Sequence, residues 1–373
     1  MRSEMVDYFE FADDLGPSKM VAIHEPSSDL KAILAIDNVA AGPAIGGTRM
    51  AADVTTEECF RLARAMTFKN SAAGLPHGGA KSVIMADPGM AADEKEELIR
   101  AFARAIRDLT DYIPGPDMGT NEQAMAFIKD EIGRAVGLPR EIGGIPLDDI
   151  GATGFGLSIA AAVAEDFCDV RIDGARVAVQ GFGAVGKHAA RFLAEQGGVL
   201  VAAADSKGVL FDAFGLDIEK LSAIKEDGGS VMDYDSGKKG KADSIVAADC
   251  DILIPAARPD FIRADNVETI RARLILQGAN IPATANAEAR LHDLGILNIP
   301  DFIANAGGVI TASVEYHGGT QSAAFAAIAE KIEANTREVL EAARREELLP
   351  RTAAERLARA RVERAMTTRR FHS

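Results

Sequence analysis

Apolar residues in the first 140 positions form short runs in some stretches and recur at helical spacing in others. Two β-like runs are joined by the turn-forming residues 26–29, an arrangement typical of a β-hairpin. Thr55 and Thr56 precede an acidic first turn and an apolar face, which predicts an N-capped helix. The β-like runs cover residues 20–24 and 30–37, and a short apolar run covers residues 82–85. The expected helices cover residues 57–69, 94–109 and 122–136.

From Arg176 onward the pattern changes to short aliphatic runs separated by helix-like stretches. This alternation predicts a parallel sheet with helices on both faces. The expected strands cover residues 176–180, 199–205, 251–255, 274–277 and 299–303. Helices are expected over the Ala-rich residues 153–167 and over residues 323–364, and a surface loop rich in Gly, Asp and Lys is expected over residues 227–241.

Gly, Pro and Asp gather between residues 143 and 150, and we place a domain boundary there. A chain of 373 residues also exceeds what one hydrophobic core usually serves. We therefore predict an α/β protein of two domains. The first, residues 1–145, has a mixed sheet, and the motifs described below make it the expected substrate and catalytic domain. The second, residues 146–334, is a Rossmann-type, doubly wound domain, and the glycine-rich turn described below makes it the expected dinucleotide-binding domain. The C-terminal helices, residues 335–373, are expected to pack back on the first domain.

The charge balance and the cysteines narrow the possible partners. A formal net charge of −15 repels phosphate backbones and anionic lipid, so we expect no nucleic-acid partner and no membrane partner. Cys59, Cys168 and Cys250 are far apart in the chain, which disfavours a disulfide framework and a zinc site, and no metal is expected. The N-terminus lacks an apolar signal core and no apolar run is long enough to span a bilayer, so a cytoplasmic protein is expected.

A glycine-rich turn, Gly181-Phe182-Gly183-Ala184-Val185-Gly186, connects the expected strand 176–180 with an expected helix. In a dinucleotide site the first glycine permits the tight turn, and the second lets the backbone approach the pyrophosphate. The third lets helix and strand pack closely. The helix N-terminus then presents unpaired N–H groups to the phosphates. The alternative is a strand–turn–helix with a purely structural role. It is less favoured, because an expected strand precedes the turn and an expected helix follows it, as in a dinucleotide site.

Asp205 closes the next expected strand, about twenty residues past the turn, where an acidic group binds the ribose hydroxyls of a dinucleotide. A carboxylate at that place repels a 2′-phosphate and so favours NAD over NADP. Lys207 is able to pair with that phosphate and weakens the preference. The alternative role for Asp205 is a simple strand-end cap.

Three charged residues of the first domain lie in or near glycine-rich stretches. They are Lys69, Lys81 and Asp117. A lysine that faces a cleft near another cation has a lowered pKa and becomes useful in proton transfer or carbonyl polarisation. An aspartate held in a Gly/Pro loop is a matching acid–base group. Taken singly, each has an ordinary explanation, since Lys69 suits a helix end and Asp117 suits a turn.

Seven stretches, taken together and in order, resemble the amino acid dehydrogenases that include the glutamate, leucine, valine and phenylalanine enzymes. They cover residues 42–50, 66–70, 74–81, 115–120, 181–186, 277–280 and 305–309. The resemblance implies reversible oxidative deamination of an L-amino acid to a 2-oxo acid and ammonia. It also implies hydride transfer to a nicotinamide cofactor, for which we expect NAD, and a homo-oligomer.

The resemblance also implies roles for particular residues. Lys69 resembles the lysine that binds the substrate α-carboxylate, and Lys81 resembles the catalytic lysine that polarises the carbonyl and activates water. Asp117 resembles the proton shuttle to the amino group. The implied substrate-binding residues further include Gly46, Gly47, Gly115 and Asn305. The implied cofactor-binding residues are Gly181, Phe182, Gly183, Ala184, Val185, Gly186, Asp205, Ala256 and Asn280.

The identity of the amino acid depends on the residues expected to surround its side chain. Where glutamate dehydrogenases carry a lysine and a serine for the side-chain carboxylate, this chain has Ile45 and Ala312. A buried carboxylate without partners costs on the order of several kcal/mol. Ile45, Met66, Val309 and Ala312 are therefore expected to form an apolar pocket for a leucine-, valine- or phenylalanine-type substrate. The length of residues 205–251, however, is more like the glutamate branch.

Two alternatives remain beside this prediction. The first is a glutamate dehydrogenase, or another NAD(P)-dependent oxidoreductase that acts on a hydroxy acid. The second is a non-catalytic nucleotide-sensing protein, which is less favoured because Lys81 and Asp117 are both present.

Overall fold

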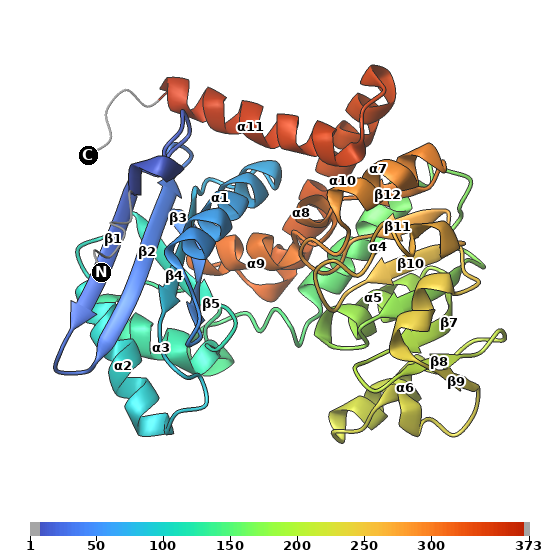
Figure 1. The fold of residues 1–373 in the computed structure, drawn as a ribbon, viewed down its shortest axis with the longest axis horizontal. Coiled ribbons are helices and arrows are strands. Elements are labelled where there is room, and N and C mark those ends of the chain that lie inside the picture. The colour runs from blue at the N-terminus through green and yellow to red at the C-terminus, as the bar shows by residue number, and fades with distance from the viewer. Residues whose placement is uncertain (1–7, 369–373) are drawn as a thin grey trace, which may run out of the picture. The chain divides into compact units, whose positions relative to one another are not determined.

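The computed structural model of the chain describes residues 8–368, which form two compact units (Figure 1). Unit 1 contains residues 8–146, 309–324 and 357–368, and unit 2 contains residues 147–308 and 325–356. The predicted second domain, residues 146–334, thus differs from unit 2 because residues 309–324 group with unit 1. Of the C-terminal residues that were expected to pack on the first domain, 335–356 group with unit 2 and 357–368 group with unit 1. Residues 1–7 and 369–373, at the ends of the predicted domains, lie outside the described residues.

Unit 1 is built on a five-stranded mixed sheet in the order β1-β2-β4-β3-β5. Its strands are β1 (Lys19–Glu25), β2 (Leu30–Asn38), β3 (Ala44–Met50), β4 (Gly79–Ile84) and β5 (Tyr112–Pro116). Its main helices are α1 (Thr56–Ala72), α2 (Ala92–Ala105) and α3 (Glu122–Ile132). Strands β1, β2 and β4 pair antiparallel, and β3 pairs parallel with both β4 and β5. The predicted hairpin is therefore confirmed.

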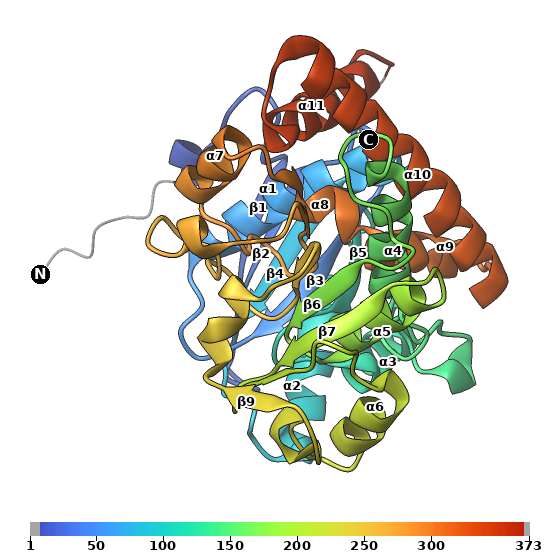
Figure 2. The same cartoon turned by 90° about the vertical axis from the view of Figure 1, so that its right-hand side faces the viewer.

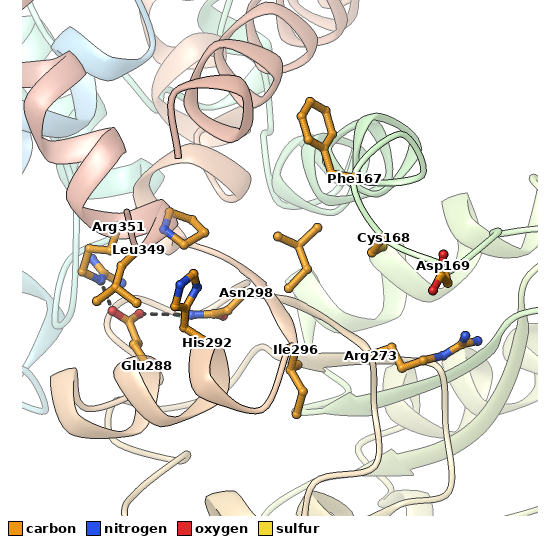
Figure 3. Close-up of a pocket in the computed structure, with 13 residues that line it drawn as sticks. Phe167, Cys168, Asp169, Arg273, Glu288, His292, Ile296, Asn298, Leu349 and Arg351 are labelled. Carbon is orange, nitrogen blue, oxygen red and sulfur yellow. Dashed lines mark hydrogen bonds and ion pairs between the residues drawn. The ribbon is translucent and has the colours of Figure 1, made fainter. Parts of the chain in front are cut away.

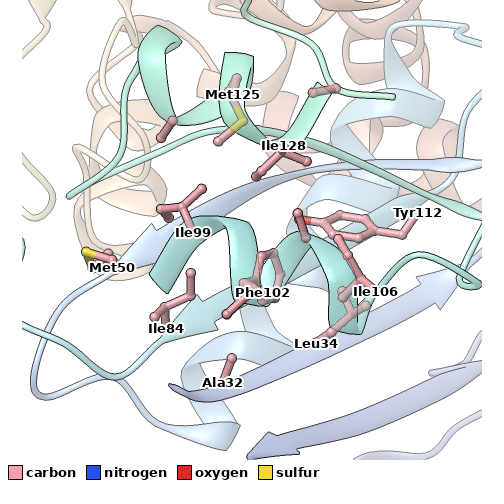
Figure 4. Close-up of a cluster of buried hydrophobic side chains, with 14 of the residues drawn as sticks. Ala32, Leu34, Met50, Ile84, Ile99, Phe102, Ile106, Tyr112, Met125 and Ile128 are labelled. Carbon is pink, nitrogen blue, oxygen red and sulfur yellow. The ribbon is translucent and has the colours of Figure 1, made fainter. Parts of the chain in front are cut away.

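Both faces of strand β2 are covered by helices. Leu34 and Ile36 pack with Phe102 of α2 in one apolar cluster, which Figure 4 shows in close-up. Ile33 and Ala35 belong to a second cluster with residues of α1. Successive side chains of a strand point to opposite faces, so α1 covers one face of the sheet and α2 and α3 cover the other. This double cover explains the nearly continuous burial of β2.

Unit 2 is built on a seven-stranded sheet in the order β12-β11-β10-β6-β7-β8-β9. Its strands are β6 (Arg176–Gln180), β7 (Val199–Ala204), β8 (Val209–Phe211), β9 (Lys238–Gly240), β10 (Ile252–Pro255), β11 (Leu274–Leu276) and β12 (Leu297–Ile299). Five neighbouring strands are parallel, and β8 and β9 add an antiparallel edge to β7. Figure 2 shows β6 and β7 near the middle of this sheet. The predicted fold class, two α/β units with a doubly wound second sheet, is confirmed.

The remaining elements are mostly helical. The helices are α4 (Ala152–Ala164), α5 (Ala184–Ala194), α6 (Ile218–Glu226), α7 (Ala285–Asp293), α8 (Asp301–Ala304), α9 (Gly307–Tyr316), α10 (Gln321–Glu346) and α11 (Pro350–Thr368). Short 3-10 turns cover Tyr8–Phe11, Arg140–Ile142, Val231–Asp233, Ala242–Ala247 and Val267–Thr269. Within unit 1, α11 packs on the end of α1, since the Ser71 hydroxyl donates to Ala358 O at 2.8 Å.

Several predicted elements differ from the structure. The helix expected over residues 94–109 ends at Ala105, and the helical stretch 323–364 divides into α10 and α11. The expected strand 299–303 is wrong: β12 ends at Ile299, because Pro300 cannot donate to a ladder, and α8 begins at Asp301. The expected loop 227–241 contains β9, which pairs antiparallel with β8. Helix α3 ends at Ile132 rather than at residue 136, because Gly133 takes a left-handed φ of 75° and caps it.

Candidate active site

Lys81 and Asp117 meet at one end of the unit 1 sheet. Lys81 lies on β4, and Asp117 follows β5 directly. Strand β3 lies between β4 and β5 and pairs parallel with each of them. The side chains of Lys81 and Asp117 therefore reach the same edge of the sheet. The Lys81 Nζ forms an ion pair with Asp117 Oδ2, and the lysine side chain is only 7% exposed. A Cβ added to Gly47 would lie 2.9 Å from Asp117 Cβ and 3.0 Å from Lys81 Nζ, so a side chain at that position would displace the pair.

Arg49 on β3 is the second cation beside this aspartate. Its Nε lies 3.1 Å from Asp117 Oδ2, and its guanidinium also pairs with Glu58. Burial lowers the pKa of the Lys81 ammonium below its ordinary value, although Asp117 opposes this shift and Arg49 adds to it. Burial alone would raise the pKa of the Asp117 carboxyl, but Lys81 and Arg49 outweigh it and hold that pKa below its ordinary value. The site thus combines an ionised carboxylate with a lysine that loses its proton more readily than a surface lysine.

The loop after β5 fixes the position of Asp117. The Thr120 hydroxyl accepts from Asp117 N at 3.0 Å and donates to Thr48 O at 2.8 Å, which ties the loop to β3. Gly119 has a φ of 79°, and a Cβ there would lie 2.0 Å from Met50 O. The glycine in this loop is therefore required for the turn that presents the carboxylate.

Lys69, the expected α-carboxylate ligand, lies half-buried near the end of α1. The next residue, Asn70, donates through Nδ2 to Gly78 O at 2.7 Å and to Ile45 O at 3.3 Å. Asn70 therefore ties this end of α1 to the strand that carries Gly46, where a Cβ would lie 1.7 Å from Ala80 O. These contacts hold Lys69 on an element that is fixed to β3.

The expected apolar pocket residues are only partly brought together. Ile45 and Ala312 form one buried cluster with Ile113 and Val136. Met66 and Val309 are half-buried and lie outside this cluster. Gly115 borders it, because a Cβ at Gly115 would lie 3.2 Å from Val136 Cγ2. The surroundings of Ile45 are thus apolar, as expected. Ile113 and Val136 contribute to them but were not among the expected pocket residues.

The glycine-rich turn in unit 2 has the local geometry of a dinucleotide site. Gly181 has a φ of 92°, and a Cβ at Gly186 would lie 2.1 Å from Gly181 O. Gly183 is the N-cap of α5 with no side-chain cap, and a Cβ added there meets nothing within 4 Å. The open space lies at the helix N-terminus, where unpaired N–H groups bind phosphate. This cradle fits a dinucleotide; Ala256, which donates to Gln180 O, borders it beside Gly181.

The environment of Asp205 differs from that expected of a free ribose-binding carboxylate. Its two oxygens accept from Lys207 N, Lys225 Nζ, Ser230 Oγ and Val231 N at 2.9–3.0 Å. Burial opposes ionisation of Asp205, but Lys225 and the other donors hold the pKa of its carboxyl below the ordinary value. Lys225 therefore balances much of the negative charge on which the NAD prediction depended.

Asn280 and Asn305 lie together in unit 2. Asn305 Nδ2 donates to Asn280 Oδ1 at 3.1 Å and to Gly278 O at 3.2 Å. Asn305 is 4% exposed, and among the described residues its Oδ1 has no hydrogen-bond partner. An unpaired buried amide oxygen needs a partner, and a donor on a bound ligand would supply one.

Sequence reasoning missed Arg49, Asn70, Thr120 and Lys225. Arg49 and Asn70 stand inside motifs that were recognised as Gly42–Met50 and Met66–Asn70, so their place in those motifs was the available signal. Lys225 gave no signal, because its contact with Asp205 joins α6 to the end of β7.

Residues 8–368 contain no group of three His, Cys, Asp or Glu residues that could hold a metal ion. No helix within the same residues has the length and apolar character needed to cross a membrane.

Comparison with known proteins identifies an amino acid dehydrogenase that uses a nicotinamide dinucleotide. The model for Glutamate/Leucine/Phenylalanine/Valine dehydrogenase matches residues 143–370, and the model for the dimerisation domain of the same enzymes matches residues 17–134. The chain belongs to the Glutamate/Leucine/Phenylalanine/Valine dehydrogenase family, as its motifs predicted.

Individual relatives differ in substrate and cofactor. The NADP-specific glutamate dehydrogenase of Saccharolobus shibatae is 38% identical over 75% of this chain and 69% of its own length. The hetero-hexameric glutamate dehydrogenase of Thermus thermophilus, solved with leucine bound, has a TM-score of 0.84 and 28% identity, over 96% of this chain and 91% of its own. The L-tryptophan dehydrogenase of Nostoc punctiforme has a TM-score of 0.75 and 28% identity, over 96% of this chain and 99% of its own.

Proposed function

We propose that this protein catalyses the reversible oxidative deamination of an L-amino acid to the 2-oxo acid and ammonia, with NAD as the hydride acceptor. The buried Lys81–Asp117 pair beside Gly47 carries the proposal. A lysine with a lowered pKa next to an ionised carboxylate is the acid–base pair that this reaction requires.

In this proposal Lys69 binds the substrate α-carboxylate. Lys81 polarises the carbonyl of the oxo acid and activates water for attack on the imino carbon. Asp117 transfers the proton to and from the substrate nitrogen. The lowered pKa of Lys81 supports its role, because such a lysine gives up its proton more readily and its neutral amine accepts a proton from water. The bound dinucleotide supplies hydride transfer, and the open turn at Gly183 supports its binding there.

The relatives favour glutamate as the substrate. Those that match at 38% identity include glutamate dehydrogenases from Aeropyrum pernix, Pyrobaculum calidifontis and Thermotoga maritima. This favours the alternative of the sequence prediction over its main apolar interpretation. Glutamate is therefore the first candidate substrate.

The cluster around Ile45 supports a second candidate, an apolar L-amino acid. Ile45, Ile113, Val136 and Ala312 are at least 92% buried and offer no charged or amide group to a side-chain carboxylate. Burial of such a carboxylate without a partner costs on the order of several kcal/mol. The likeness to a tryptophan dehydrogenase over nearly its whole length is in line with this candidate.

NAD remains the proposed cofactor. One observation supports this choice and two weigh against it. The Asp205 carboxylate at the end of β7 supports NAD, since it repels a 2′-phosphate. Lys225, 2.9 Å from that carboxylate, reduces the repulsion, and two relatives are named as NADP-specific or NADP-dependent enzymes. We further propose a homo-oligomer, because the family model that matches residues 17–134 describes a dimerisation domain. The structural neighbour from Thermus thermophilus is a hetero-hexamer, which supports assembly of several chains. The cytoplasmic location stays a prediction.

The reductive direction tests the proposed reaction. NADH and NADPH oxidation is followed by absorbance with 2-oxoglutarate or 4-methyl-2-oxopentanoate, each with and without ammonium. Oxidation that requires ammonium supports the proposal. Oxidation that proceeds equally without it would identify a hydroxy-acid enzyme instead, and binding of NADH without turnover of any oxo acid would identify a sensing protein.

A further inference from the structure

A buried charged network in unit 2 surrounds Arg351, at the start of α11. The Arg351 guanidinium donates to Glu288 Oε2 at 2.6 Å, to Asp301 Oδ1 at 2.9 Å and to Gln277 Oε1 at 2.9 Å. The side chains of Glu288 and Asp301 are 4% and 8% exposed. Figure 3 shows Glu288 between Arg351 and Asn298 at the edge of a cavity of about 410 Å³. One arginine therefore balances two carboxylates that have almost no access to water.

Gln277 stands at the centre of this network, directly after β11. Its Nε2 donates to Glu288 Oε1 at 2.6 Å and to Asn298 Oδ1 at 3.1 Å. Its Oε1 accepts from Asp301 N at 3.2 Å as well as from Arg351. Every polar atom of the Gln277 side chain thus has a partner, which fixes its orientation.

The same network holds the turn that follows Gln277. Asp301 Oδ2 accepts from Ile281 N at 2.9 Å, and Ile281 has a φ of 49°, which a β-branched residue rarely adopts. Asp301 O also accepts from Asn305 N at 2.7 Å, and Asn305 in turn donates to Asn280. The backbone around Asn280 is therefore held from both ends by residues that Arg351 contacts directly.

We propose that Arg351 is a positioning residue for dinucleotide binding, which acts through Gln277 and Asp301 on Asn280 and Asn305. This inference rests on the proposed function and on the roles expected from the family resemblance, cofactor binding for Asn280 and substrate binding for Asn305. The unpaired buried Oδ1 of Asn305 is the atom whose orientation matters most, because it is the acceptor left for a ligand donor. Arg351 donates to Gln277 and Asp301, and it is through these two residues that it orients Asn305.

Arg351→Lys tests the inference. The lysine keeps the positive charge but lacks the planar fork that reaches three acceptors at once. The adjoining cavity leaves room for water to hydrate the ammonium, so the variant is expected to fold. We expect the dissociation constant for NADH, measured by fluorescence without amino acid, to rise about tenfold, and the cofactor KM to rise with it. The KM for the amino acid is expected to rise as well, because Asn305 is also an expected substrate-binding residue.

Arg290→Lys is the matched control, since Arg290 lies on α7 beside Glu288 but forms an exposed pair with Glu268. Glu288→Gln is the second variant, because it keeps the size of the side chain and removes the charge that faces Arg351. If Arg351→Lys and Glu288→Gln both fold and both bind NADH with wild-type affinity, the inference is overturned. Lower melting temperatures alone would then show that the network only stabilises the fold. Absence of NADH and NADPH binding by wild type itself would instead refute the proposed function.

Discussion

The Lys81 ammonium and the Asp117 carboxylate form a direct ion pair, although 36 positions separate them in the sequence. Strand β3 lies between the strands that carry them, and Gly47 on β3 leaves the space in which they meet. The pair has an ordinary structural function as well, since the Lys81 ammonium is buried, the Asp117 carboxylate is only 20% exposed, and each charge needs the other. Variants must therefore separate loss of chemistry from loss of fold.

Asp117→Asn is expected to lower kcat by about 10²–10⁴-fold, because the amide keeps the shape of the side chain but cannot carry the proton. Lys81→Ala is expected to have an effect at least as large. Initial rates of NADH formation measure both effects, and NADH fluorescence measures whether cofactor binding persists. Near-normal turnover in either variant would refute the role given to that residue.

Arg49→Gln tests how the pKa of Lys81 is set. Burial and the Arg49 charge lower the Lys81 pKa, so oxidative activity should rise with pH through a midpoint below the ordinary lysine value of 10.5. Removal of the Arg49 charge raises that pKa, and the rising limb of the kcat/KM profile moves to higher pH. Arg61→Gln, an exposed arginine on α1, is the control. A shift to lower pH would contradict the electrostatic account.

Ile45→Lys combined with Ala312→Ser tests the apolar surroundings of the substrate side chain. The new ammonium and hydroxyl supply partners for a carboxylate, so the ratio of kcat/KM for glutamate to that for leucine should rise on the order of tenfold or more. Ile113→Val, which keeps the cluster apolar, is the control. If wild type already prefers glutamate and the double variant lowers that preference, the side chain is bound elsewhere.

Lys225→Gln tests the influence of the Asp205 environment on the cofactor. Without the lysine, the Asp205 carboxylate is less neutralised and repels a 2′-phosphate more strongly, so the kcat/KM ratio of NAD to NADP should rise severalfold. Lys220→Gln on the same helix removes an exposed lysine that pairs with Asp235, and it should leave the ratio unchanged. An unchanged ratio in Lys225→Gln would show that the charge of Asp205 does not determine the choice between NAD and NADP.

Asp13→Asn tests an ion pair remote from the proposed site. Hydrogen bonding to Arg64 lowers the pKa of Asp13 from 3.8 to about 2. A depressed folded-state pKa contributes stability that is complete above the ordinary value and is lost as pH falls through about 2. Asp13→Asn should therefore cost about 1 kcal/mol near neutral pH, after discounting for solvent exposure, and almost nothing at pH 2. Melting curves measure the difference, and an equal cost at both pH values would contradict this linkage.

Local signals in the sequence predicted local structure well. Thr55 caps α1 by accepting from Glu58 N, and the turn at Gly181–Gly186 joins β6 to α5 as its glycine spacing implied. Pro300 is also a local signal, because a proline cannot donate to a strand ladder. It ends β12 and precedes α8, which is why the expected strand 299–303 is wrong.

Contacts between distant residues were beyond the reach of pattern reasoning. Arg49 meets Asp117 across 68 positions, and Arg351 meets Gln277 across 74. Ile113 joins Ile45 only because β5 pairs with β3 in that register. Asp205 was recognised by its place after β7, but its neutralisation by Lys225 depends on how α6 packs. Periodicity and spacing identify elements and motifs, whereas these partners depend on tertiary packing.

The most direct test of the central claim is the absorbance of NADH or NADPH formed when the purified protein is mixed with NAD or NADP and each of the common L-amino acids. We predict reduced cofactor with glutamate or with an apolar L-amino acid, together with release of ammonia in equal amount. Absence of reduced cofactor with every L-amino acid, from protein that binds NADH, would contradict the assignment as an amino acid dehydrogenase.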